Sequence, residues 1–203
     1  MKKISLLFSF VFHPIFFPVL GTLFYCKYTQ NYWAQDYFYL LLFQVVIITF
    51  LLPLTFFYLL KTIGKIDTIL LPETTQHKMP IFVQLTLTLL LIYKSVTYDR
   101  FAELFYFFAA SCIGLLALFL LLFVKIKASL HLFAMGSYTF FVMAMALHNQ
   151  VNVVLYLAFL FITTGFIATS RLALKAHNGQ EIYIGYLIVG RNATRETKKN
   201  CYI

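Results

Sequence analysis

Long apolar segments alternate with short polar ones along most of the chain, and this pattern predicts transmembrane helices. A helix needs about 20 apolar residues to cross the hydrocarbon core of a bilayer. Six segments have roughly that length: residues 4–25, 37–60, 81–98, 101–124, 129–147 and 151–169. A backbone in lipid must satisfy its own hydrogen bonds, and the segments lack the period-two alternation of membrane strands. We therefore expect helices.

A shorter apolar run, residues 181–189, follows the sixth segment. It predicts a short C-terminal helix that is either a seventh span or a half-span packed against the others. Residues 192–203 are polar and basic and are expected to form a tail. The predicted fold class is therefore all-α, a polytopic transmembrane helix bundle with six long spans and a short C-terminal helix. We expect a single domain over residues 1–191.

Proline and glycine residues inside the predicted spans suggest where the helices bend and touch. Prolines at positions 14, 18 and 53 should kink their spans, because proline removes a helical hydrogen bond. Small residues let helix backbones approach closely in membranes. The candidates for such contacts are Gly114, Gly136, Gly165 and Gly185.

Composition agrees with a membrane protein. Of 203 residues, 62% are hydrophobic and 11% are charged, whereas soluble domains carry roughly 25% charged residues. The net charge of +9 comes from basic residues in short loops, where they orient the protein and meet anionic headgroups. No basic soluble domain is present to bind nucleic acid. Cys26, Cys112 and Cys201 are too far apart in sequence to indicate a zinc site or a disulfide framework.

The distribution of basic residues predicts an orientation. With the N-terminus inside, most of them fall on the inner face, as the positive-inside rule requires. The inner set is Lys2, Lys3, Lys61, Lys65, Lys78, Lys125, Lys127, Arg171 and Lys175, and the outer set is Lys27, Lys94 and Arg100. The polar segments 61–80, 125–131 and 170–180 are each separated by two spans. They should therefore lie on the same membrane face.

Two of these polar segments contain residues suited to an anion. Glu181 follows His177 by four residues, so on a helix its carboxylate can reach a ring nitrogen of the histidine. Arg171 precedes them and can bind two oxygens of a phosphate. Ser129 occupies the expected N-cap of the fifth span, and His131 lies one turn inside. The alternative, purely structural interpretation of Ser129 and His131 is a capped helix with an interfacial histidine.

The same residues resemble two motifs of the type 2 phosphatidic acid phosphatase superfamily. Ser170-Arg171, five residues, His177, three residues and Glu181 resemble its third motif, with Glu in place of Asp. Ala128-Ser129-Leu130-His131 resembles the second motif, Pro-Ser-Gly-His. The closest counterpart of the first motif lies in residues 71–80, with Lys78 or His77 near its arginine and without its upstream lysine. The resemblance covers about residues 61–191.

The resemblance implies a metal-independent lipid phosphatase without a cofactor, in a bacterial cytoplasmic membrane. The substrate would be a lipid phosphate or a polyprenyl diphosphate. His177 would be the nucleophile that forms a phosphohistidine, Glu181 would fix its tautomer, and His131 would protonate the leaving oxygen. The phosphate-binding residues would be Arg171, Ser129, Lys78 and Lys127. The implied partners are an anionic lipid and the membrane.

Departures from the superfamily pattern leave an alternative open. Leu130 replaces a glycine, Glu181 replaces Asp, and the first motif is degraded. The chain would then be a non-catalytic protein that binds an anionic lipid or a partner protein. A small transporter would place polar residues at mid-membrane depth, whereas the charges here lie near span ends. His13, before Pro14, is expected to be a histidine at a helix kink and not a site residue.

Overall fold

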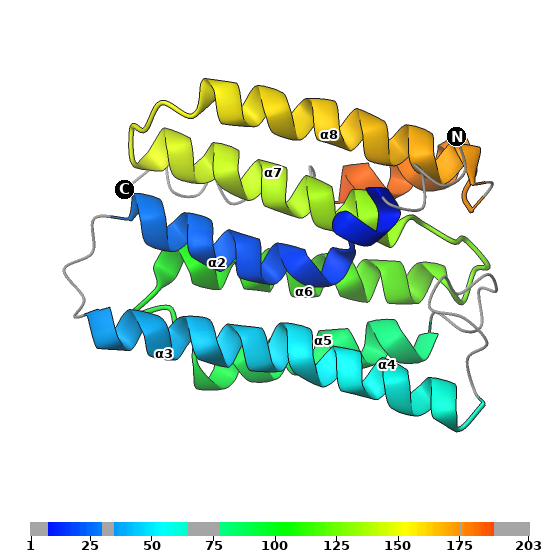
Figure 1. Cartoon of the computed structure of the whole chain (residues 1–203), viewed down its shortest axis with the longest axis horizontal. Coiled ribbons are helices and arrows are strands. Elements are labelled where there is room, and N and C mark those ends of the chain that lie inside the picture. Colours follow the sequence, from blue (N-terminus) through cyan, green and yellow to red (C-terminus); the bar gives the residue numbers. More distant parts are fainter. Residues whose placement is uncertain (1–7, 30–34, 65–77, 175, 189–203) are drawn as a thin grey trace. The chain divides into compact units, whose positions relative to one another are not determined.

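The computed structural model describes residues 8–29, 35–64, 78–174 and 176–188, and every regular element within these ranges is helical (Figure 1). The prediction of an all-helical protein is therefore confirmed. The elements are η1 (Pro14–Phe16), α2 (Phe17–Tyr28), α3 (Gln35–Val46), the π-helical η2 (Ile47–Leu51), α4 (Leu52–Thr62), α5 (Lys78–Lys94), α6 (Ala102–Leu121), α7 (Leu130–His148) and α8 (Val154–Ala173). Residues 8–11 and 179–188 are also helical.

Five helices in the described ranges are long and apolar enough to cross a membrane. They are Phe8–Tyr28, Tyr37–Thr62, Ala102–Leu121, Leu130–His148 and Val154–Ala173. The span predicted at residues 81–98 corresponds to α5, which has 17 residues and is not among the five. The transmembrane character of the chain is thus supported, and the count of six spans stays a prediction.

The chain divides into two compact units, residues 1–30 with 128–203 and residues 31–127. In the first unit α7 packs against both α2 and α8. Its inward residues recur every three or four positions, and its most deeply buried hydrophobic residues are Leu132, Met135, Tyr138, Val142 and Met145. The hydroxyls of Tyr138 and Tyr156 share a hydrogen bond of 2.6 Å, which satisfies both in an apolar setting. This packing fixes α7, whose N-terminal end carries Ser129 and His131.

The second unit is built from α3, η2, α4, α5 and α6. Helices α5 and α6 pack together, and α5 also contacts η2 and α4. Pro53 lies in the first turn of α4, directly after the π-helical turn of η2. Because proline has no N–H to donate, the wider turn before it accommodates the missing hydrogen bond. The structure thus has a π-helical turn directly before Pro53, where the sequence predicted a kink.

The first span is broken at Pro14. The helix of residues 8–11 ends before His13, whose ψ of 138° is extended, and the chain resumes as η1 and α2. A residue before proline avoids the helical region for steric reasons. Pro18 lies in the first turn of α2, where proline is tolerated, so it starts a helix and does not kink one. The kink predicted at Pro14 is thus confirmed, and that at Pro18 was wrong.

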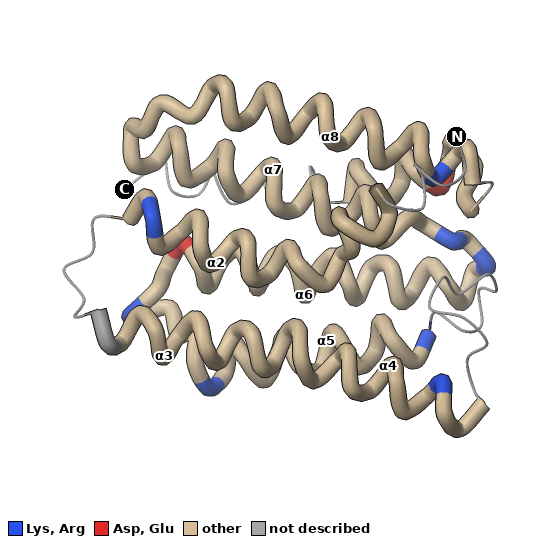
Figure 2. The backbone as a smooth tube through the Cα atoms, viewed as in Figure 1, with Lys and Arg blue, Asp and Glu red and all other residues tan. Residues whose placement is uncertain are grey.

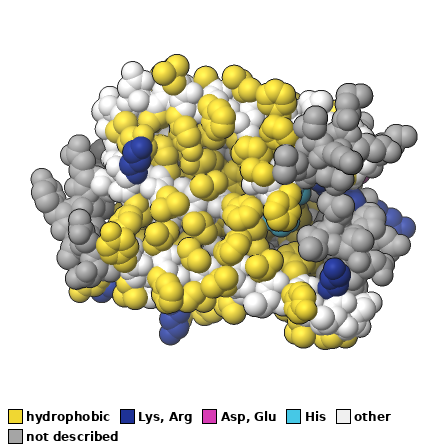
Figure 3. Space-filling view, viewed as in Figure 1, with side chains coloured by type: hydrophobic (Ala, Val, Ile, Leu, Met, Phe, Trp, Pro, Cys, Tyr) yellow, Lys and Arg dark blue, Asp and Glu magenta, His cyan; other side chains and the backbone are white. Residues whose placement is uncertain are grey.

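Charged side chains stay near helix ends (Figure 2). Lys27, Lys61, Lys94 and Arg171 lie in the last turns of their helices, and Glu103 lies in the first turn of α6. Large hydrophobic side chains cover much of the face seen in Figure 3. A soluble domain rarely exposes so many large hydrophobic side chains, whereas lipid solvates them. The surface agrees with helices in a bilayer.

Candidate functional site

The end of α8 and the turn after it bring Arg171 and His177 into the interior of the first unit. Arg171 is 5% exposed and His177 is 7% exposed. The N–H of Leu174 donates to the carbonyl of Ser170 at 3.0 Å, and the N–H of Ala176 donates to that of Arg171 at 3.1 Å. These bonds close the last turn of α8 and reverse the chain. Arg171 and His177 are thus buried instead of facing solvent.

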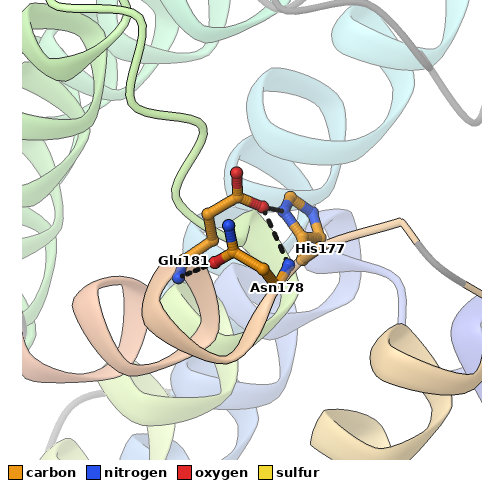
Figure 4. A network of polar contacts seen from close by, with 3 residues as sticks. All are labelled: His177, Asn178 and Glu181. Atoms are coloured by element: carbon orange, nitrogen blue, oxygen red, sulfur yellow. Dashed lines mark hydrogen bonds and ion pairs between the residues drawn. The ribbon is translucent and has the colours of Figure 1, made fainter.

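Three residues at the start of helix 179–188 form a closed hydrogen-bond network (Figure 4). The N–H of Glu181 donates to Oδ1 of Asn178 at 2.8 Å, and the N–H of Asn178 donates to Oε2 of Glu181 at 3.1 Å. This reciprocal pair is a capping box with Asn as the N-cap. The same Oε2 lies 3.1 Å from Nδ1 of His177. The cap that starts the helix therefore also positions the carboxylate on the histidine.

The contact with Glu181 sets the tautomer of His177. A carboxylate only accepts hydrogen bonds, so Nδ1 of His177 carries the proton that it donates. In the neutral ring Nε2 then holds the lone pair, and a positive charge on the ring is stabilised by the carboxylate. The pair is enclosed, since the His177 side chain is 2% exposed and that of Glu181 is 22% exposed. This is the contact that a spacing of four residues predicts.

The two motifs are joined through backbone atoms of Ser129 and the helix of residues 179–188. The N–H of Ser129 donates to the carbonyl of Glu181 at 3.1 Å. A Cβ on Gly185 would lie 2.6 Å from the carbonyl oxygen of Ser129, closer than any tolerated contact. Glycine at position 185 is what allows this approach, which was predicted from its small size. Gly165, by contrast, meets no atom within 4 Å, so its predicted close contact was wrong.

Helix 179–188 is also held against the middle of α7. A Cβ on Gly136 would lie 3.2 Å from the ring of Tyr186, and that ring packs on Phe140 with centroids 5.7 Å apart. Burial raises the pKa of the Tyr186 phenol, so the ring stays neutral. The packing fixes the helix that carries Glu181.

His131 and Arg171 meet at a residue of the first span. Nε2 of His131 lies 3.1 Å from the carbonyl oxygen of Ser9, and Nη1 of Arg171 donates to Oγ of Ser9 at 3.4 Å. Because a carbonyl only accepts, Nε2 of His131 carries the donated proton. The carbonyl of Glu181, whose carboxylate bonds to His177, accepts from the N–H of Ser129, two residues before His131. The residues of both motifs therefore belong to one buried polar cluster.

Two polar atoms in this cluster have no partner. Among the residues that the structure describes, the buried side-chain atoms without a hydrogen bond are Oγ of Ser129, Nε of Arg171 and Oγ1 of Thr29. Ser129 is the N-cap of α7, as predicted, but its hydroxyl does not cap the helix. A buried donor without an acceptor costs about 1–3 kcal/mol, and more for a charged group. An anion with several oxygens would satisfy both the hydroxyl and the guanidinium.

The remaining predicted residues lie in the second unit or outside the described ranges. Lys78 starts α5, with Nζ 4.7 Å from the centroid of the Phe123 ring. Lys127 is the last residue of that unit. Residues 71–77, Lys175 and the tail 192–203 lie outside the described residues. The proposed phosphate contacts of Lys78 and Lys127 therefore stay predictions, as does the first-motif counterpart.

The structure adds two residues that sequence reasoning did not place in the site. Ser9 contacts both His131 and Arg171, and the ring of His13 stands edge-on to that of His131 with centroids 5.6 Å apart. His13 was expected to be only a kink histidine. It does cap η1, where the N–H of Ile15 donates to its Nδ1 at 3.4 Å. The signal in the sequence was Pro14, which predicts a break in the helix but not that residues beside the break contact His131.

No family model, curated protein or solved structure matches this chain.

Proposed function

We propose that the chain is a membrane phosphatase-like enzyme that hydrolyses a lipid phosphate or a polyprenyl diphosphate. The proposal includes six membrane spans, a bacterial cytoplasmic membrane and a site at headgroup depth. The support for membrane spans comes from five helices of sufficient length and hydropathy. The support for the chemistry comes from the polar cluster of Ser9, Ser129, His131, Arg171 and the His177–Glu181 pair.

One observation carries the proposal: the buried Nε of Arg171 and the buried hydroxyl of Ser129 have no hydrogen-bond partner beside an oriented histidine. Nε of Arg171 and Oγ of Ser129, from two separate segments of the chain, are the two partnerless atoms of the cluster. Glu181 bonds through Oε2 to His177 and through its backbone carbonyl to the N–H of Ser129, two residues before His131. Phosphate oxygens accept bonds from both groups, while the oriented imidazole supplies a nucleophile.

The proposed reaction has two steps. Nε2 of His177 attacks phosphorus, the bond from phosphorus to the ester oxygen breaks, and the leaving oxygen takes a proton from His131. Water then attacks the phosphohistidine, the P–N bond breaks, and a proton of that water returns to His131. The sum converts a phosphate monoester and water into alcohol and phosphate, or a polyprenyl diphosphate and water into polyprenyl phosphate and phosphate. Glu181 stabilises the charge on His177, and Arg171 stabilises the charge on phosphorus oxygens.

A second candidate function is binding of an anionic lipid without turnover. It is favoured because the one ring proton of a neutral His131 lies on Nε2 and is held by the Ser9 carbonyl, so only a positively charged ring could protonate a leaving oxygen. The partnerless atoms, Nε of Arg171 and Oγ of Ser129, would gain hydrogen bonds from a bound anion whether or not a reaction follows. This alternative shares the anion site with the first proposal and differs only in chemistry.

The test is phosphate release by the purified protein from phosphatidic acid and from undecaprenyl diphosphate, in detergent with a metal chelator present. We expect release by the wild type, a loss of at least about 10³-fold in His177→Ala, and a loss of about 10²-fold in Arg171→Gln. The matched controls are His148→Ala, at the far end of α7, and Arg100→Gln, in an exposed turn. Both should keep wild-type rates.

Three outcomes separate the candidates. Equal release by the wild type and His177→Ala would rule out the nucleophile. No release by any protein, together with lipid binding that survives His177→Ala but is lost in Arg171→Gln, would favour the binding protein. No release and equal lipid binding by all variants would contradict both candidates.

A further inference from the structure

Ser9 connects the two key side chains of the cluster although it lies in neither motif. It is 4% exposed, its carbonyl accepts the Nε2 proton of His131 at 3.1 Å, and its hydroxyl accepts from Nη1 of Arg171 at 3.4 Å. The two contacts use different atoms of one residue. They can therefore be removed separately.

The carbonyl of Ser9 is available because the first span is broken. In a continuous helix this oxygen would accept from the N–H of His13, four residues later. Pro14 drives His13 to an extended conformation with ψ of 138°, and the helix ends at residue 11. Carbonyls in a last helical turn lack partners in their own helix. The imidazole of His131 supplies the missing donor.

We propose that Ser9 is a positioning residue of the candidate site. The break at Pro14 leaves its carbonyl without a helical donor and therefore available to His131. Its carbonyl fixes His131 as the Nε2-protonated tautomer, and its hydroxyl steadies the guanidinium of Arg171. The catalytic role of this arrangement rests on the proposed function. The two contacts of Ser9 are independent of it.

The arrangement determines which atom of His131 serves the reaction. The carbonyl of Ser9 accepts the Nε2 proton in both the neutral and the charged ring, so the exchangeable proton is carried on Nδ1. His13 stands edge-on to the same ring, with centroids 5.6 Å apart and planes at 80°. It helps to hold the plane of the His131 ring. The leaving oxygen would therefore take its proton from Nδ1 of His131.

The first experiment reads the tautomer directly. Full-length protein with ¹⁵N-labelled histidine is studied by NMR in lipid bilayers, and the His131 signals are assigned as those absent from His131→Gln. We expect a protonated Nε2 and an unprotonated Nδ1 in the neutral wild type. Pro14→Ala lets the helix continue, so the N–H of His13 competes for the Ser9 carbonyl and the tautomer populations shift. The matched control is Pro18→Ala, which should leave the signals unchanged because Pro18 lies in the first turn of α2.

The second experiment tests the hydroxyl. Binding of orthovanadate or inorganic phosphate to Ser9→Ala is compared with binding to Ser111→Ala, a control whose hydroxyl bonds only within α6. Loss of one long hydrogen bond to Arg171 should weaken anion binding about 2- to 10-fold, while the His131 tautomer stays as in wild type. The control should bind as wild type.

The outcomes separate this inference from the proposed function. An Nδ1-protonated His131 in the wild type, or unchanged His131 signals in a folded Pro14→Ala, would overturn the role of the carbonyl. Equal anion binding by Ser9→Ala and wild type would overturn the role of the hydroxyl. Absence of phosphate release with the expected tautomer and binding would overturn catalysis and leave Ser9 as a positioning residue of an anion site.

Discussion

Glu181 performs two tasks with one oxygen atom. Oε2 accepts from the N–H of Asn178 and from Nδ1 of His177, each at 3.1 Å. The first bond starts a helix, and the second sets a tautomer. Substitutions can separate these tasks because the first needs only an acceptor, whereas stabilising a charged imidazole needs a negative charge.

Glu181→Gln should therefore reduce activity far more than stability. Glutamine completes a capping box as glutamate does, so we expect a stability change below about 1 kcal/mol. The lost charge should lower phosphate release by about 10²-fold or more. Phosphate release and thermal unfolding in detergent check this. Glu103→Gln, in the first turn of α6, is the control and should leave the rate unchanged. A Glu181→Gln protein with full activity would refute the role of the carboxylate.

Gly185→Ala should disrupt the junction between the two motifs. The new Cβ would lie 2.6 Å from the carbonyl oxygen of Ser129, so the backbone must shift. Overpacking of this kind costs about 1–3 kcal/mol. We expect a lower unfolding temperature and reduced phosphate release. Gly165→Ala is the matched control, since its Cβ would meet no atom within 4 Å and should be neutral or slightly stabilising. Similar behaviour of the two variants would contradict the close approach.

At the residue scale the sequence predicted local contacts and missed remote ones. The contact of His177 with Glu181 was predicted from a four-residue spacing, although His177 lies before the helix and Glu181 reaches it from the capping box. The contacts of Ser9 span 122 residues to His131 and 162 residues to Arg171. No periodicity encodes such a pairing, because it depends on how three helices pack and on a carbonyl that the break at Pro14 leaves without a helical partner.

The short helix of residues 179–188 is the element on which the site depends most. It begins at a cap built from Asn178, ends its first turn with Glu181 and passes Ser129 at Gly185. Short helices are marginal without capping and packing. Its start should therefore influence activity.

Asn178→Ala should destabilise this helix and reduce activity together. Loss of the cap costs about 0.5–2 kcal/mol, and the carboxylate of Glu181 loses its support. The matched control is Asn152→Ala, which removes a comparable bond of 3.3 Å to the N–H of Val154 at the other end of α8. Hydrogen exchange of residues 179–188 and phosphate release are measured for both variants, and only Asn178→Ala should change them. Asn178→Asp should restore both, and unchanged exchange in Asn178→Ala would argue against the cap.

At the element scale the apolar runs predicted where helices lie but not how they end. The sixth segment was expected to stop at residue 169, whereas α8 continues to Ala173 and takes Arg171 into its last turn. The π-helical turn of η2 was not foreseen. Hydropathy indicates which residues prefer lipid. It does not predict where α-helical hydrogen bonding changes to π-helical hydrogen bonding. Only the prolines hinted at these irregularities.

At the scale of the whole molecule, the described site residues lie in one of two compact units. That unit joins residues 1–30 to residues 128–203. The resemblance to the phosphatase superfamily covered residues 61–191. It therefore omitted the first span, which belongs to the first unit, and included residues 61–127 of the second unit. Lys78 and Lys127, two of the predicted phosphate-binding residues, belong to the other unit, residues 31–127.

The orientation in the membrane is a prediction at this scale. If α5 crosses the membrane as a sixth span, the segment of residues 61–80 and the chain after residue 191 lie on the same face, inside by the distribution of basic residues. Alkaline phosphatase and green fluorescent protein fusions at both positions measure this. We expect fluorescence and no phosphatase activity at both. Reporters on opposite faces would show that α5 does not cross, or that the C-terminal helix does.

The central claim is that His177 carries the phosphoryl group during turnover. Its most direct test is to quench the protein during reaction with ³²P-labelled phosphatidic acid and to locate the label by mass spectrometry. We predict an acid-labile, alkali-stable phosphohistidine at position 177 in the wild type and none in His177→Ala. Label on another residue, or turnover without any labelled protein intermediate, would contradict the account.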